Sequence, residues 1–262
     1  MFFIIPLYSL LATSLFDPTG STLTGYDMTW HVANYWNALS QYWPFLLRSL
    51  WYAGIATIIC LVLGYTLAYA IAFKSGRWKY VMLVLVIAPF FTSFLLRTLS
   101  WKLILSDDGW IVDTMKALLL LPDDGRLLAT PFAVVAGLTY NFLPFMILPL
   151  YASLDKIDTR LHEASGDLYA NPAKTFFKVT WPLSLPGVVA GTLLTFIPAS
   201  GDYINADLLG SPNERMVGNV IQSLFTTSNQ PALAGALSVI LMVIIVVMVM
   251  FYVRKAGTED LL

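Results

Sequence analysis

Residues 154–186 read LDKIDTRLHEASGDLYANPAKTFFKVTWPLSLP and form the longest charged segment between two apolar runs of the sequence. Asp158 is a suitable N-cap for a short helix, because its carboxylate accepts hydrogen bonds from the free N–H groups of a first helical turn. Asn171 followed by Pro172 can begin a second helix, since proline fits the first helical position. The stretch therefore predicts two short helices in a polar loop, which we interpret as a docking surface facing the cytoplasm.

The composition of the chain places this loop in a membrane protein. Of the 262 residues, 58% are hydrophobic and 12% are charged, which is too apolar for a soluble domain. Several uncharged runs reach about 20 residues, the length that an α-helix needs to cross a hydrocarbon core of about 30 Å. The sequence thus predicts an all-α polytopic membrane protein. A net charge of −1 gives no indication of a nucleic acid partner.

Five apolar runs are long enough to cross a lipid bilayer. They are residues 50–73, 80–105, 127–154, 183–200 and 231–253. Pro89 is expected to allow a kink in the second of these runs. Residues 1–16 are apolar but reach only about 24 Å as a helix. We therefore expect a first span that begins upstream of Met1, and about six spans in a single membrane domain, residues 1–262.

The charges of the loops indicate how the chain is oriented. Residues 74–79 carry basic side chains and no acid, and the loop at 154–182 and the C-terminal end of the last run also carry basic side chains. Because positively charged loops stay in the cytoplasm, both loops and the C-terminus are predicted there. The aromatic segment 17–45 and the acidic segment 106–126 are then predicted to be extracytoplasmic.

Within the polar loop, Glu163-Ala164 followed by Val179 and Pro182 resembles the EAA loop of binding-protein-dependent ABC importer permeases. That loop reads Glu-Ala-Ala, then a glycine six residues after the Glu, then Ile-x-Leu-Pro. This sequence departs from it in four places, with Ser165 for the second Ala, Tyr169 for the Gly, Val179 for the Ile and Trp181 for the Leu. Tyr169 matters most, because glycine adopts positive φ cheaply and tyrosine does not. Either the first helix runs on, or Asn171 takes the turn.

In the family that this loop resembles, the loop forms a coupling helix that sits in a groove on the ATPase subunit. The resemblance implies the same role for Glu163, Ala164, Ser165, Gly166, Asp167, Leu168, Tyr169 and Ala170. The alternative interpretation is an amphipathic loop helix that lies on lipid headgroups.

Two further stretches resemble the spermidine/putrescine-type permeases, namely residues 89–101 (PFFTSFLLRTLSW) and residues 201–210 (GDYINADLLG). The resemblance implies the type I ABC importer transmembrane fold and a translocation subunit of a prokaryotic inner membrane that is not an enzyme on its own. It implies a second permease subunit, two ATPase subunits through which ATP acts, and an extracytoplasmic solute-binding protein as partners. A polyamine is the expected substrate. The alternatives are an opine, an aminophosphonate or ferric iron, or, from another class, a secondary transporter.

Arg97 and Trp101 are candidates for the substrate path, because both fall in the outer half of a predicted span. An arginine within a membrane is costly and usually faces protein or water. In the competing interpretation, Arg97 snorkels outward or pairs with an acid to hold helices together. A cation beside a path for a cationic substrate would repel it, and pairing with Asp202 or Asp207 would remove that objection.

Three further residues are candidates for the same path. Asn141 lies near the middle of a proline-interrupted run, and the carbonyl groups that prolines free can line a cavity, although a simple kink is an equal alternative. Asp202 and Tyr203, close to Asn205, can meet a polyammonium ligand by charge pairing and cation–π contact. The alternative for this last group is an ordinary polar loop with solvated acids.

Some chemistries receive no support from the sequence. No G-x-x-x-x-G-K-[ST] run occurs, so we expect no ATP or other cofactor to be bound by this chain itself. His31 and His162 fall in loops assigned to opposite sides of the membrane, which argues against a shared metal site. Each is interpreted as a surface residue.

Overall fold

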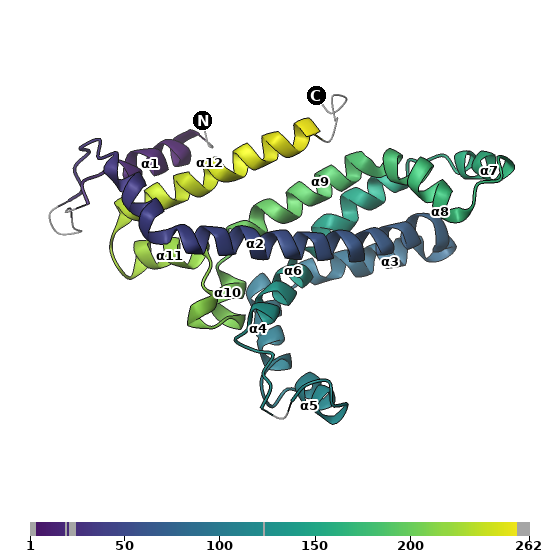
Figure 1. The fold of residues 1–262 in the computed structure, drawn as a ribbon, viewed down its shortest axis with the longest axis horizontal. Coiled ribbons are helices and arrows are strands. Elements are labelled where there is room, and N and C mark those ends of the chain that lie inside the picture. Colours follow the sequence, from purple (N-terminus) through teal and green to yellow (C-terminus); the bar gives the residue numbers. More distant parts are fainter. Residues whose placement is uncertain (1–3, 19, 21–24, 123, 256–262) are drawn as a thin grey trace.

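The computed structural model describes residues 4–18, 20, 25–122 and 124–255, which form a bundle of helices (Figure 1). No strand occurs among these residues, and an isolated β-bridge joins Phe16 to Met28. The all-α prediction is confirmed. Residues 1–3 of the apolar N-terminal run and residue 123 of the acidic segment lie outside the described residues.

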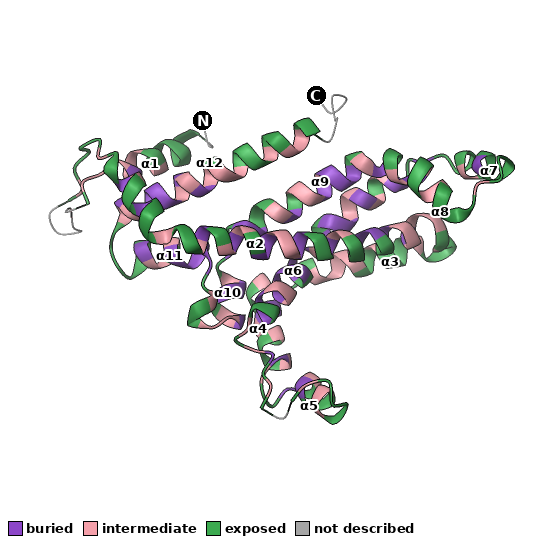
Figure 2. Ribbon diagram, in the orientation of Figure 1, coloured by how far each residue is buried: buried purple, intermediate pink, exposed green. Residues whose placement is uncertain are grey.

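Four long helices build the bundle, α2 (Ala33–Tyr69), α6 (Pro131–Leu154), α9 (Trp181–Ser200) and α12 (Pro231–Lys255). The contacts of α6 are most extensive with α2 and α9. Glycines make these contacts close, because a Cβ at Gly64 or Gly191 would collide with Met146, and a Cβ at Gly187 would collide with Ser153. Buried residues gather where these three helices meet, whereas the second half of α12 is largely exposed (Figure 2).

Among the described residues, four helical segments are long and apolar enough to cross a membrane, and one bent pair of helices brings the number to five. The four are Ala33–Lys74, Pro131–Leu154, Pro172–Ser200 and Pro231–Lys255. Each overlaps one of the predicted runs, which confirms the multi-span prediction. The shorter apolar helix α1 (Ile4–Ser14) packs against α12.

The span that was predicted to start at residue 50 begins several turns earlier, at Ala33. Part of the segment 17–45 is therefore helical and continuous with the span. Tyr35 and Tyr42 on this part pack against a buried apolar cluster that α2 forms with α11 (Val217–Thr226) and α12. Aromatic packing against distant helices extends α2 here, which a search for an unbroken apolar run does not detect.

The predicted span at residues 80–105 is two helical limbs rather than one kinked helix. Gly76–Phe91, which contains α3 (Lys79–Ile87), and α4 (Phe94–Ile104) meet at an angle of 93°. The break falls at Thr92 and Ser93, whose backbones are extended, a short distance beyond Pro89. As a result α4 and the following α5 (Trp110–Ala117) project sideways from the bundle (Figure 1).

Two short helices that the sequence analysis did not predict, α10 (Ile204–Leu209) and α11, connect α9 to α12. Asn219 ties this segment together, since its Nδ2 donates to the Tyr203 carbonyl at 2.8 Å and its Oδ1 accepts from the Met216 N–H at 3.0 Å. The Ser49 hydroxyl of α2 accepts from the Val217 N–H at 2.7 Å. These hydrogen bonds hold α10 and α11 against the bundle.

The turn at residues 74–79 and the loop at 154–182 lie at the same end of the bundle (Figure 1). Lys79 forms an ion pair with Asp155, and the Tyr151 hydroxyl donates to the same carboxylate at 3.1 Å. This arrangement agrees with the charge pattern, which predicts that both loops face the cytoplasm.

Candidate functional site

The polar loop contains α7 (Arg160–Asp167) and α8 (Pro172–Thr175). The predicted start of α8 is confirmed, because Asn171 is its N-cap and accepts from the Lys174 N–H at 2.8 Å. The second helix is not short as predicted, since α8 continues into α9 as one helical segment, Pro172–Ser200. α7 starts one residue later than expected, with Thr159 at the N-cap position. The Asp158 carboxylate still accepts from the Arg160 N–H at 2.9 Å, so it satisfies one free donor of the first turn.

Tyr169 takes the left-handed turn that ends α7, with φ of 55°. Both alternatives from the sequence are therefore wrong, because α7 ends at Asp167 and Asn171 has an extended backbone. A left-handed non-glycine residue costs roughly 1–2 kcal/mol. The turn leaves Leu168 80% exposed and Tyr169 97% exposed. The loop thus carries two apolar side chains at its tip that contact little of this chain.

The other face of α7 is anchored to the bundle through His162 and Ser165. His162 Nε2 lies 3.0 Å from Thr180 Oγ1, and its imidazole ring meets the Phe73 ring edge-on at 5.0 Å. The Ser165 hydroxyl is hydrogen-bonded to the Thr175 hydroxyl at 2.7 Å. His162 is partly exposed, and its ring packs on this contact.

Two π-helical turns lie where α7 meets the bundle, Ala70–Lys74 after α2 and Phe176–Thr180 before α9. Phe73 belongs to the first turn and Thr180 ends the second, so His162 contacts both. The rings of Tyr65 and Phe176 also join the two helices, with centroids 5.5 Å apart. Single π-helical turns inside α-helices are frequent at functional sites. The loop motif recognised in the sequence, with its six-residue spacing from Glu163 to Tyr169, does not reveal these π-helical turns.

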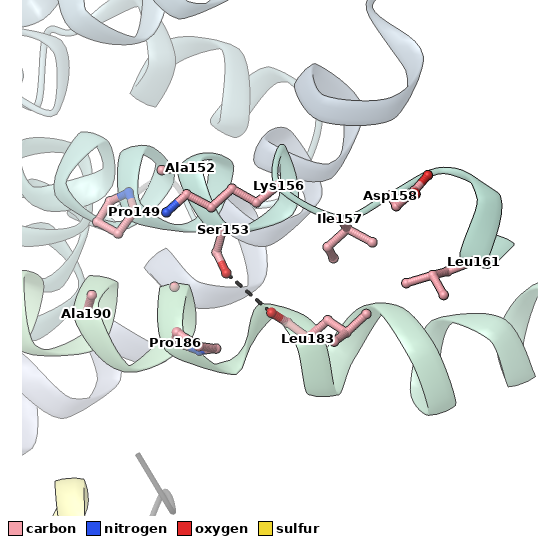
Figure 3. Close-up of a pocket in the computed structure, with 11 residues that line it drawn as sticks. Pro149, Ala152, Ser153, Lys156, Ile157, Asp158, Leu161, Leu183, Pro186 and Ala190 are labelled. Carbon is pink, nitrogen blue, oxygen red and sulfur yellow. Dashed lines mark hydrogen bonds between the residues drawn. The ribbon is translucent and has the colours of Figure 1, made fainter. Parts of the chain in front are cut away.

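A cavity of about 620 Å³ opens between α6 and α9 beside this loop (Figure 3). Lys156 and Asp158 supply one positive and one negative charge to its wall. The Ser153 hydroxyl donates across it to the Leu183 carbonyl at 3.5 Å. Leu161 of α7 borders the same space, so a shift of the loop would change the shape of this cavity.

A second group of polar side chains lies inside the bundle, where α4, α6 and α10 converge. Asn141 Nδ2 donates to Asn205 Oδ1 at 3.0 Å and to Thr98 Oγ1 at 3.1 Å. Asp202 Oδ1 accepts from the Asn205 N–H at 2.8 Å. We call Thr98, Asn141, Asp202 and Asn205 the central polar cluster. It brings together two of the predicted path residues, Asn141 and Asp202. Thr98 was not predicted, because its hydroxyl becomes informative only once these helices meet.

Asp202 lies in the link between α9 and α10 and is only 8% exposed. This burial raises the pKa of its carboxyl to about 6, because desolvation disfavours the charged form. Tyr203 is 41% exposed and lies next in the chain. Asn141 Oδ1 and Asn205 Nδ2 are buried without a hydrogen-bond partner. The cluster is therefore polar, enclosed and incompletely satisfied.

Arg97 is 9% exposed and does not snorkel outward. It forms no ion pair with an acid in the described part of the chain, so the alternative pairing with Asp202 or Asp207 is absent there. Its guanidinium carbon lies 5.8 Å from the Phe90 ring centroid and 5.7 Å from that of Phe94. Arg97 thus contacts aromatic faces instead of a carboxylate.

Trp101 lies on the same helix as Arg97 and packs against Tyr140 of α6, with ring centroids 5.5 Å apart. Of the five predicted path residues, three (Asn141, Asp202 and Tyr203) lie in or beside the central polar cluster. Arg97 and Trp101 are held by aromatic contacts instead.

A bundle of membrane-spanning helices with an exposed loop helix at one end and a polar cluster inside defines a membrane transport subunit. Residues 61–256 match the family model described as "Binding-protein-dependent transport system inner membrane component", and the chain belongs to this family. It is accordingly a multi-pass protein of the inner membrane.

Curated relatives match almost the whole chain. The spermidine/putrescine transport system permease protein PotB of Haemophilus influenzae is 39% identical over 254 residues, covering 97% of this chain and 88% of the relative. The protein of the same name from Escherichia coli is 35% identical over 257 residues, covering 98% of this chain and 93% of the relative. Among solved structures, a bacterial ABC transporter involved in alginate import matches with a TM-score of 0.75 and 15% identity, covering 99% of this chain and 91% of that one. This last similarity supports the fold alone.

Proposed function

We propose that this chain is the translocation subunit of an ATP-driven importer for polyamines such as spermidine and putrescine. The observation that carries the proposal is the 39% identity to a spermidine/putrescine permease over 97% of the chain. The partners would be a second permease subunit, two ATPase subunits and an extracytoplasmic solute-binding protein. ATP would be hydrolysed by the ATPase subunits and not by this chain.

The loop that contains α7 would couple this chain to an ATPase subunit. Its exposed tip at Leu168 and Tyr169 offers apolar surface to a partner, and Glu163 is exposed on the same helix. His162 and Ser165 would carry a shift of α7 into the bundle, because they contact Phe73, Thr180 and the helix that follows the loop. Closure of the ATPase subunits would thereby move α2 and α9 as packed helices and give alternating access.

The central polar cluster would lie on the path of the substrate. The Asp202 carboxylate can pair with an ammonium group, and the partly exposed Tyr203 ring can add a cation–π contact. Asn141 and Asn205 have buried polar atoms left without partners. An ammonium group that enters the cluster could donate a hydrogen bond to Asn141 Oδ1, whereas the Asn205 Nδ2 donor needs an acceptor.

Affinity purification of the tagged chain in mild detergent, followed by reconstitution into vesicles, tests this proposal. We expect an ATPase and a second permease to co-purify, and labelled spermidine to accumulate only with ATP and the binding protein present. If an opine, an aminophosphonate or ferric iron competed with labelled spermidine and putrescine did not, the competing solute would become the proposed substrate. Active uptake by the chain alone without ATP would overturn the proposal in favour of a secondary transporter.

A further inference from the structure

The bend between α3 and α4 is an elbow enclosed by four phenylalanine rings. Phe90 comes just before the break, Phe94 just after it, and Phe142 and Phe145 face them from α6. The centroids of Phe90 and Phe145 are 5.0 Å apart, those of Phe94 and Phe142 are 6.1 Å apart, and those of Phe142 and Phe145 are 6.1 Å apart. Each limb of the elbow is thus attached to α6 through an aromatic pair. We call these four residues the phenylalanine cage.

Arg97 reaches back from α4 and places its guanidinium over Phe90 on one limb and Phe94 on the other. Its Nε and Nη1 atoms are buried and make no hydrogen bond. A buried guanidinium is ordinarily paired with carboxylates or carbonyl groups, because it carries five donors and a permanent charge. Here the aromatic faces are its principal stabilising contacts. Those faces attract any cation, because the attraction comes from the ring quadrupole.

The cage is also open to the outside of the chain. Phe90 is 36% exposed and Phe145 is 37% exposed, whereas Phe142 is 7% exposed and closes the cage from within. A second cation can therefore approach the two rim rings while Arg97 occupies the inner position. The neighbouring α4 residue, Thr98, belongs to the central polar cluster, so the cage lies next to the candidate path.

We propose that the phenylalanine cage is a binding site for a substrate ammonium group, and that Arg97 fills it as a tethered substitute when no substrate is bound. The inference rests on the proposed function, because it requires a cationic substrate. Displacement of Arg97 by an ammonium group removes the direct contact of the Arg97 side chain on α4 with Phe90, one of the contacts that join the two limbs of the elbow. Substrate occupancy thereby loosens the bend between α3 and α4. The same competition explains how Arg97 can lie beside a path for a cationic substrate, since the Arg97 side chain moves out of the cage when the substrate binds.

Equilibrium binding of labelled spermidine to the purified permease–ATPase complex, without the binding protein, tests the competition directly. We expect Arg97→Gln to tighten binding by about 2- to 30-fold, the range of a cation–π contact. Adding Phe90→Leu or Phe94→Leu to Arg97→Gln is expected to abolish that gain. A purely structural role for Arg97 gives no gain in affinity, because the substitution then only loosens the elbow.

Two matched controls separate the cage from general effects. Lys102→Gln removes an exposed cation from the same helix and is expected to leave binding unchanged, whereas an equal gain would assign the effect to bulk electrostatics and overturn the proposal. Phe91→Leu, in which an 86% exposed ring beside Phe90 is replaced, is expected to preserve the gain of Arg97→Gln.

The same set of variants distinguishes failure of this inference from failure of the proposed function. If the complete wild-type importer accumulates spermidine but Arg97→Gln binds it no more tightly, the cage proposal alone is overturned. If the complete wild-type importer accumulates no polyamine, the proposed substrate is wrong and the cage proposal falls with it. Co-purification of the ATPase with each variant verifies that the complex has assembled.

Discussion

The polar loop at residues 154–182 and the interior of the bundle differ in how their polar groups are satisfied. In the loop, His162, Ser165 and Asn171 all have hydrogen-bond partners within the chain, and Leu168 and Tyr169 at the tip are 80% and 97% exposed. In the interior, Arg97, Asn141 and Asn205 keep buried polar atoms without partners. Burying an unpaired polar group is costly, so it persists where something else completes it. The helix α7 is thus held to the bundle by hydrogen bonds, and the interior contains buried polar atoms that have no hydrogen-bond partner in the described residues.

The largest effect is expected at the exposed face of α7. Glu163→Lys should lower ATP-driven uptake by more than about 30-fold, because reversing a charge in a protein interface costs several kcal/mol. The protein should still insert into the membrane, since Glu163 is exposed and makes no ion pair in the described residues. Uptake by reconstituted vesicles and quantitative blotting of the membrane fraction measure the two properties. Normal uptake by this variant would refute the coupling role.

The next largest effect on uptake is expected at His162, which holds α7 to the bundle. His162→Ala removes both the hydrogen bond to Thr180 and the ring contact with Phe73. These contacts are each worth about 1 kcal/mol, so uptake should fall by roughly 5- to 30-fold while the ATPase remains bound and active. Simultaneous loss of ATPase binding would show that His162 shapes the docking surface instead of transmitting movement. Arg160→Ala, an exposed change on the same helix, controls for altered helix stability.

Asp202 should give a smaller effect that depends on pH. Asp202→Asn is expected to weaken polyamine uptake several-fold more than it weakens assembly with the ATPase. Because the pKa of Asp202 is raised to about 6, wild-type uptake should rise as the pH increases through 6 and the carboxylate forms. The variant should lack this dependence. Equal loss of uptake and assembly, with an unchanged pH profile, would mean that the residue is structural.

The raised pKa of Asp202 also has a consequence for stability. The folded chain retains this proton to a higher pH than the unfolded chain, so the free energy of unfolding should fall as the pH rises from 3.8 to about 6. Thermal unfolding of wild type and Asp202→Asn across this interval tests the sign. If Asp202 instead stabilised the fold when charged, the difference between the two proteins would grow in the opposite direction.

The smallest stability effect is expected at the tip of the loop. Tyr169→Gly removes the strain of a left-handed tyrosine but adds backbone entropy to the unfolded chain, and these terms nearly cancel at about 1 kcal/mol each. Thermal stability should therefore change little, whereas uptake should fall because the exposed ring is lost. A clear drop in stability with full uptake would show that the ring supports the loop and does not dock. Leu168→Ala tests the neighbouring side chain without changing the turn.

Local patterns in the sequence were sufficient to predict where α8 begins. Asn171 and Pro172 begin α8 as predicted because a cap and a first turn depend on a few adjacent residues. The turn at Tyr169 was not predicted, because left-handed geometry is costly for a residue with a Cβ and the local sequence offered Asn171 for the turn. The contacts of His162 were not predicted either, since its partners Phe73 and Thr180 come from two other helices.

The sequence alone determined the membrane class, most of the spans and the family resemblance, since hydropathy and short motifs are properties of neighbouring residues. Only the tertiary structure decided the early start of α2, the 93° elbow and the helices α10 and α11. Each depends on contacts between segments far apart in the chain. The surroundings of Arg97 were also decided by the tertiary structure, because the Phe90 ring that its guanidinium contacts lies across a break in the helix. Burial and pairing of a charge are decided by which helices meet, which no single stretch of sequence specifies.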